Sequence, residues 1–416
     1  MNGLTPALTG RWRYQDTVLT LCTLSMLATM VARIAFSPLV PAITASYGVS
    51  NGMIGVALTG MWFTYGIVQF PSGILANRYG ERRIILLATG GTMLTCVLIT
   101  AAPLFALFTT GMILLGAVAG MHYSVATSLL SRTYDNVGTA IGVHHLGGAI
   151  GGLLGPVGAS LILNQYGWQH AVVGSGLVAG IAFGLFLWRV RPVKPQNPDA
   201  DLDSQSVVKP ALKRLKKPRT ALLMIVTILI MFVLQGLISF LPTFFVEFHE
   251  RSTELAGILF AIFFGTQAVM QTGVGILSDY VDSGKIISTC LLVGIVGLGL
   301  LLVSGGFVVI VAGSVLLGTG AAVLTVLIAQ IMNSLPEGNR SSSFGLTQSI
   351  VMVGGSLGSV SVGILADLYG WYVSFGVLTA LFGICFLTYA LDPTNARQTT
   401  QRPEPADPEQ TTAPND

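Results

Sequence analysis

Apolar runs of about 20 residues or more recur along this chain of 416 residues, separated by short polar breaks. About 20 helical residues cross a hydrocarbon core ~30 Å thick, where backbone polar groups must be satisfied within the chain. With 52% hydrophobic and 9% charged residues and a mean hydropathy of +0.74, most of the chain is not a soluble surface. We predict an all-α integral membrane protein with twelve spans, at roughly 17–44, 52–76, 83–103, 105–130, 138–163, 169–190, 219–246, 253–278, 285–304, 306–334, 342–366 and 371–391.

Lysines and arginines set the predicted orientation. If the N-terminus is cytoplasmic, 19 of the 21 basic residues lie in inner loops and tails, against Arg251 outside and Arg33 within a span. This positive-inside asymmetry places both termini in the cytoplasm and the chain in the plasma membrane. It also accounts for the net charge of +3 without a nucleic-acid partner. The expected partners are therefore the lipid bilayer and a small-molecule substrate.

A polar segment divides the chain in two. Residues 191–218 are rich in Pro, Asp and Lys and contain no apolar span, which predicts a cytoplasmic linker. The linker would join a six-helix bundle at 1–190 to a second at 219–391. Residues 392–416 are rich in Pro, Thr, Gln and Glu and predict a disordered cytoplasmic tail.

The two halves also repeat. GILAN at 73–77 returns as GILSD at 275–279, and YGW at 166–168 returns at 369–371, in each case 202 or 203 residues later. Pro41 is matched by Pro242 at nearly the same spacing. Repeats that span whole halves are typical of transporters that rock about a site near the bilayer midplane, so we expect alternating access.

GILANRYGERR, after the second span, resembles the loop signature of the major facilitator superfamily, and GILSDYVDSGK resembles its weaker second copy. The resemblance covers about residues 15–391 and is closest to the prokaryotic, twelve-span type. In that family the glycine allows close helix packing, while the acid and arginines form a cytoplasmic charge latch that holds the halves together when the cavity faces outward. The implied gating residues are Gly73, Asn77, Arg78, Gly80, Glu81, Arg132, Gly275 and Asp279.

This chain departs from the signature in its charges. Asn77 stands where the acid is expected and Glu81 where an arginine is expected, although Asp279 keeps the acid of the second copy. The first latch would then run with reversed charge, Glu81 reaching Arg132 or Arg78. Ordinary solvated loop charges, whose pairs stabilise little, are the alternative. GGLLGPVGAS at 151–160 also resembles a drug-exporter signature, but it lacks the closing glycine pair.

Arg33 lies inside the first apolar run, on a polar stripe with Ser25, Thr29 and Ser37 at helical spacing. Shifting the stripe by the repeat gives Gln235 and Ser239 on the seventh span, and a second stripe carries Tyr65 and Gln69. We therefore predict that a set of eight residues binds substrate between the halves: Arg33, Ser37, Tyr65, Gln69, Gln235, Ser239, Gln267 and Gln271. An intramembrane charge costs from roughly 2.5 kcal/mol upward and is usually retained for function.

Each of these polar residues has a structural alternative. Serines and threonines in membrane helices often bond their own backbone, and glutamines often bond between helices. Arg33 could instead snorkel to the outer interface. An arginine before the proline of the first span also resembles the anion-transporting branches of the superfamily, whose phosphate exchangers carry a second arginine where this chain has Gln235. One guanidinium suits a carboxylate or a monovalent oxyanion better than a phosphate dianion.

All 18 Asp and Glu residues lie at span ends, in loops or in tails, so no carboxylate is placed to carry a proton at the midplane. Proton coupling would then pass through His122, His144 and His145, since histidine exchanges protons near neutral pH. Helix-to-helix bonding is the alternative role for these histidines, and sodium is the alternative coupling ion.

Motifs for enzyme chemistry are missing. There is no HExxH, no Walker A loop and no nucleophile elbow, so we expect no enzyme activity, cofactor or metal. The predicted function is secondary active transport by a monomer, with a small organic or inorganic anion as substrate and uptake as direction. Proton-coupled export of lipophilic drugs or metabolites is the alternative.

Overall fold

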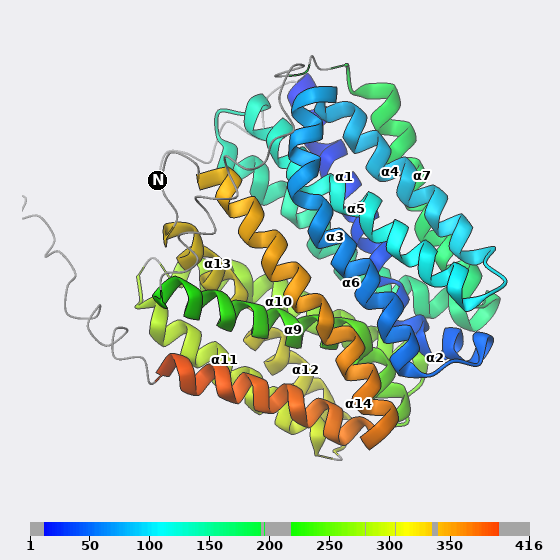
Figure 1. Cartoon of the computed structure of the whole chain (residues 1–416), viewed down its shortest axis with the longest axis vertical. Coiled ribbons are helices and arrows are strands. Elements are labelled where there is room, and N and C mark those ends of the chain that lie inside the picture. Colours follow the sequence, from blue (N-terminus) through cyan, green and yellow to red (C-terminus); the bar gives the residue numbers. More distant parts are fainter. Residues whose placement is uncertain are drawn as a thin grey trace, which may run out of the picture.

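The computed structural model describes residues 12–192, 195, 218–278, 280–303, 305–334 and 340–390. Within these ranges all regular structure is helical, and no strand is present (Figure 1). The predicted linker, 191–218, lies outside the described residues except for Arg191, Pro192, Pro195 and Pro218. The predicted tail, 392–416, and Asp279 lie outside them as well.

Seven helices form the first half of the chain. They are α1 (Tyr14–Ile34), α2 (Phe36–Tyr47), α3 (Asn51–Tyr79), α4 (Glu81–Thr100), α5 (Phe105–Thr133), α6 (Val137–Tyr166) and α7 (Trp168–Arg189). The first two form a single candidate span of 34 residues, so the half contains six spans. Every end lies within four residues of its predicted position, because span length and polar breaks mark it in the sequence.

The first span breaks at Ala35, which the apolar pattern does not predict. Pro38 follows three residues later. A proline has no N–H to donate to the carbonyl four residues back, and its ring clashes with that carbonyl. That carbonyl belongs to Ile34, so α1 ends there and α2 starts anew. Arg33 is thereby placed in the last turn of α1, beside the break.

The second half contains α9 (Pro218–Glu247), α10 (Thr253–Leu277), α11 (Ser283–Leu302), α12 (Phe307–Ala321), α13 (Val323–Ser334) and α14 (Arg340–Ala390). Helices α12 and α13 belong to one candidate span. Helix α14 is kinked at Gly370, and Figure 1 shows its two arms folding back on each other. The last of the eleven candidate spans in the described residues, 45 residues long, contains two membrane crossings. The described residues therefore form twelve spans.

The repeat extends to backbone conformation. Gly167 has φ 87° and ψ 167°, and Gly370, in the second copy of YGW, has φ 81° and ψ 169°. A side chain is strained in this region, so both positions require glycine to turn the chain from one span to the next. The tryptophan that follows, Trp168 or Trp371, is buried in both halves.

The two halves contact each other at one end of the bundle (Figure 1). We name this end, which carries Tyr47 and Asn51, the outer end, and the end with Tyr79 and Glu81 the inner end, after the predicted orientation. The contacts pair α3 with the first arm of α14, α6 with α10, and α2 with α9. A Cβ atom at Gly55 would lie 2.8 Å from the Ser359 carbonyl oxygen of the opposite half. Backbone thus packs on backbone across this seam, as small residues allow in membrane proteins.

Candidate functional site

Arg33 is almost completely buried, with 3% of its surface exposed. Its Nε donates to the Thr29 carbonyl oxygen at 3.0 Å, and a terminal nitrogen lies 3.6 Å from the Met30 sulfur. Its guanidinium carbon lies 4.1 Å from the centre of the Tyr65 ring and 5.1 Å from that of Trp62. These partners carry no formal charge, and the one ion pair found among the described residues does not involve Arg33. The side chain points back along α1, so the snorkelling alternative does not fit this conformation.

The rest of the polar stripe is engaged in packing. The hydroxyls of Ser25 and Thr29 donate to carbonyls of their own helix, as the structural alternative expects. Ser37 donates to the Ile238 carbonyl across the seam, and Ser239 is bonded to Ser359 at 2.6 Å. In this conformation Ser37 and Ser239 therefore hold helices together. The charged member of the predicted set is Arg33.

The four glutamines of the predicted set lie on three helices. The side chain of Gln235 is buried, and its Nε2 lies 3.6 Å from the Met352 sulfur within the second half. Gln69 and Gln267 are buried too, and Gln271 is half-buried. Tyr65, from the second predicted stripe, contacts Arg33 directly.

Three histidines gather where α5 meets α6. His122 and His144 are fully buried, with ring centres 5.3 Å apart. His145 is exposed, and its Nε2 lies 3.1 Å from the hydroxyl of Tyr123. All three histidines are predicted from the sequence as candidates for proton coupling, but the sequence does not predict that they form one cluster. No group of metal-ligating side chains large enough to hold an ion occurs in the part of the chain that the structure describes.

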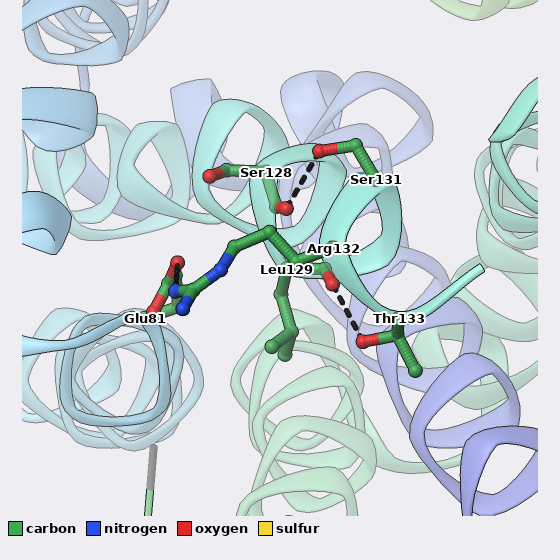
Figure 2. A network of polar contacts seen from close by, with 6 residues as sticks. All are labelled: Glu81, Ser128, Leu129, Ser131, Arg132 and Thr133. Atoms are coloured by element: carbon green, nitrogen blue, oxygen red, sulfur yellow. Dashed lines mark hydrogen bonds and ion pairs between the residues drawn. The ribbon is translucent and has the colours of Figure 1, made fainter. Parts of the chain in front are cut away.

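The inner end carries the predicted ion pair of the loop signature. Figure 2 shows Arg132, at the end of α5, reaching Glu81, at the start of α4. Their Nη1 and Oε1 atoms are 2.6 Å apart, with Glu81 fully buried and Arg132 partly exposed. Glu81 also lies where the helix dipole favours negative charge. Of the two partners that the sequence allows for Glu81, the structure therefore contains Arg132, and the pair lies within the first half.

The other gating residues differ from the close packing implied by the resemblance. A Cβ atom at Gly73 would meet no described atom within 4 Å, and one at Gly275 would meet only a methyl group of Thr325, at 3.8 Å. Neither glycine is closely packed in this conformation, and the contact that the resemblance implies for the outward-facing conformation stays a prediction. Gly80 is required for another reason, its φ of 89°.

Two further residues of the loop signature, Asn77 and Arg78, lie in the last turn of α3. The guanidinium of Arg78 lies over the neighbouring Tyr79 ring at 5.7 Å, and Asn77 is half-buried. Nearby, Tyr134 donates to the Asp16 carboxylate, and burial together with this carboxylate raises the pKa of Tyr134 to about 12.

Asp367 makes a contact between the two halves that sequence reasoning missed. It lies in α14, and its carboxylate accepts hydrogen bonds from the backbone of Asn51 at 3.1 Å and of Gly52 at 2.7 Å. These are free N–H groups of the first turn of α3, where negative charge is favoured. One half thus caps a helix of the other at the outer end. Only an acid at the end of the eleventh span hints at this in the sequence, and its partner is set by tertiary packing.

A comparison with known families agrees with the loop signature, the twelve spans and the paired halves. The sequence profile of the Major Facilitator Superfamily matches residues 22–254 and 247–414. The chain belongs to this superfamily. It is accordingly a membrane transporter, and the resemblance drawn from the loop signature is confirmed.

Relatives in the superfamily differ in what they are named for. A probable nitrate transporter, NarT, of Staphylococcus epidermidis is 24% identical over 376 residues, covering 89% of this chain and 94% of that protein. The multidrug resistance protein MdtG of Citrobacter koseri is 28% identical over 308 residues, covering 69% of this chain and 72% of that protein. A bacterial homologue of the human lysosomal transporter Spinster, solved inward-facing and unoccupied, has a TM-score of 0.80 at 16% identity, over 95% of this chain and 100% of that chain. This last likeness shows the fold alone.

Proposed function

We propose that this transporter moves a small monovalent anion, a planar oxyanion such as nitrate or a carboxylate, and that Arg33 binds it. The main support for this proposal is the buried guanidinium of Arg33, whose contacts are a carbonyl, a thioether and two aromatic faces. A charge in such a place is costly unless a partner arrives to neutralise it. An anion supplies that partner and accepts two parallel hydrogen bonds from the guanidinium.

The size and charge of the substrate follow from the surroundings of Arg33. A second arginine would favour a dianion, but the seventh span offers Gln235, which is buried against Met352. Trp62 and Tyr65 form an apolar wall beside the charge, which suits a weakly hydrated anion. The probable nitrate transporter among the relatives supports the same substrate class.

We propose alternating access with uptake as the direction. The outer end is closed by backbone contacts and by the Asp367 cap, whereas Gly73 and Gly142 at the inner end face no described atom within 4 Å. This conformation would release the anion inward. The opposite conformation would close the inner end and open the seam.

The test uses purified protein in liposomes, with nitrate as the first probe and formate, phosphate and a lipophilic cation beside it. We expect Arg33→Ala to weaken nitrate binding about 10- to 100-fold, the worth of a charged hydrogen-bonded contact. Arg33→Lys should bind nitrate with an affinity between those of the unaltered protein and Arg33→Ala. Lysine keeps the positive charge but loses the planar group that donates two parallel hydrogen bonds. Arg189→Ala is the matched control, since Arg189 also stacks on a ring, at 4.0 Å from Trp188, but lies at the exposed end of α7.

Export of lipophilic compounds is the second candidate. The relative MdtG, a multidrug resistance protein, favours it, as does the partial glycine and proline pattern in α6. If nitrate and formate bind Arg33→Ala and the unaltered protein equally, or if only lipophilic cations are carried, export replaces the anion proposal.

A further inference from the structure

His122 and His144 form a buried pair of imidazoles near the backbone of Cys22. Their ring centres are 5.3 Å apart, and each side chain is fully buried. All four ring nitrogens are shielded from solvent without a hydrogen-bond partner in the described structure. A buried polar group that is left unsatisfied costs about 1–3 kcal/mol, so such a pair calls for a ligand.

A proton is the ligand that this geometry fits. Two neutral imidazoles present one donor and one acceptor each, and rotation of the rings brings a nitrogen of one toward a nitrogen of the other. Such an N–H···N bond would satisfy two of the four nitrogens, and one added proton would make the pair singly positive and be shared along that bond. A second proton would place two like charges side by side, which burial disfavours.

We propose that the His122–His144 pair binds one proton, shared between the two rings, and that this proton travels with the anion held by Arg33. The inference rests on the proposed function for its anion and adds the coupling ion. The proton comes from solution, occupies a ring nitrogen, and returns to solution on the other side of the membrane. No covalent bond other than this N–H forms or breaks.

Two further side chains that can carry a proton lie next to the pair. Exposed His145 follows His144 in the chain, with the two ring centres 6.3 Å apart. Tyr123 follows His122, its ring centre lies 6.5 Å from that of His144, and its hydroxyl is bonded to His145. Neutral imidazole and phenol both donate and accept, so these two side chains can pass a proton between solvent and the buried pair.

The other ionisable groups around the pair favour a single site. On α1 they are Arg33, Cys22 and Asp16, the last at the inner end, and on α3 Tyr65 accompanies Arg33. Helix α4 contributes Glu81, which is already bonded to Arg132 at the inner end. Helices α7 and α10, which also pack against α6, place their ionisable groups at their ends: His170 and Arg189 on α7 and Glu254 on α10. No carboxylate of the described residues is bonded to either ring.

Arg33 provides the coupling. It is buried in the same half of the chain as His122, and both side chains are positive when His122 is protonated, so the two charges repel. A monovalent anion on Arg33 cancels one of them and makes the proton easier to bind. By linkage the proton then strengthens anion binding by the same factor. This reciprocity is what a proton–anion symporter needs.

The experiment measures protons directly. The full-length protein in detergent, at low buffer strength, receives nitrate while a pH indicator reports proton uptake, and calorimetry reports nitrate binding. We expect about one proton taken up per nitrate bound, and a nitrate affinity that rises by up to tenfold for each unit of falling pH while the pair is neutral. Arg33→Ala should abolish both signals together.

Histidine variants separate the site from the anion. His122→Asn and His144→Asn should each abolish proton uptake and flatten the pH profile of nitrate binding, and the double variant should do no more, because one proton is shared. His170→Gln is the control, since His170 lies outside the cluster on α7 and bonds the Tyr166 carbonyl. Size-exclusion profiles and thermal unfolding show whether each variant is folded, and His122→Gln and His144→Gln replace any that are not.

The outcomes distinguish the two proposals. Nitrate binding without proton uptake, or with uptake that survives in the double variant, overturns the shared-proton site and leaves the anion proposal standing. Losses in the single variants that add up in the double variant overturn the sharing. Failure of nitrate and formate to bind at all overturns the proposed function, and with it the coupling.

Discussion

The guanidinium of Arg33 lies 4.1 Å from the centre of the Tyr65 ring, closer than to any other ring. A cation over an aromatic face is worth about 0.5–2 kcal/mol when it is removed from water. Tyr65→Leu should therefore weaken nitrate binding about 3- to 30-fold by releasing Arg33 from its position. Tyr65→Phe keeps the face and should bind nearly as well. Equal nitrate affinities for the two variants, measured by calorimetry, would show that the ring does not position Arg33.

The Glu81–Arg132 pair is asymmetric in burial, and its two members should respond differently to substitution. Arg132→Gln takes a positive charge from a fully buried carboxylate, whereas Glu81→Gln leaves an arginine that already reaches solvent. We expect Arg132→Gln to lower the thermal unfolding temperature in detergent more than Glu81→Gln does. The opposite order would mean that the buried carboxylate is held by other groups. Arg83→Gln in the same loop is the control.

Gly73 should accept a larger side chain in this conformation but not in the conformation whose inner end is closed. Since a Cβ atom there meets no described atom within 4 Å, Gly73→Leu should insert and unfold normally. Transport should nevertheless stop, because the side chain would prevent the inner ends from closing. Gly184→Leu, an equally open position on the exposed face of α7, controls for added bulk alone. Normal nitrate exchange by Gly73→Leu would remove the gate role.

The Asp367 cap should stabilise the closed outer end. Asp367→Ala leaves two N–H groups of α3 without their acceptor and removes a negative charge from a helix N-terminus, worth about 0.3–1 kcal/mol. We expect a shift toward the conformation open at the outer end, seen as faster labelling of a cysteine placed at Ser356. Asp282→Ala, which removes the cap of α11 within one half, should leave that labelling rate unchanged.

His249 should make stability depend on pH. It lies outside the spans and bonds the Leu301 carbonyl at 2.9 Å, and burial, with the nearby Arg251, lowers its pKa in the fold. The unfolded chain, with an ordinary histidine pKa of about 6.5, then binds more protons than the folded one. Stability should therefore be full above about pH 6.5 and fall as the pH drops below it. Thermal unfolding at pH 7.5 and 5.5 should show a smaller difference for His249→Gln.

The spans and the family were predictable because both depend on local sequence. Hydropathy sets the span ends, and the repeated loop GILAN and GILSD carries the family signature. The break at Ala35 is local too, but it becomes visible only when Pro38 is read against the carbonyl of Ile34. The apolar pattern continues through that position, so it gave no sign of a second helix.

The site was predictable only in part. Spacing on one helix placed Arg33 and, on a second helix, Tyr65, and the repeat related the halves, but no pattern shows which helix faces which. The sequence therefore predicts that Ser37 and Ser239 bind substrate, whereas in the structure Ser37 bonds the Ile238 carbonyl across the seam and Ser239 bonds Ser359 of α14. The Asp367 contact joins residues 315 positions apart and has no local signal.

The backbone seam at the outer end has a consequence for leakage. Where Gly55 meets the Ser359 carbonyl and Gly363 meets the backbone of Asn51, no side chain holds the helices apart. A file of water needs room for each molecule and polar partners along its length, and such close packing provides neither. Protons and small ions cross membrane proteins along such files. We therefore expect a replacement as small as Gly55→Ala to cause a leak of protons or small ions through the protein. This leak should occur before any change in which substrate the protein carries.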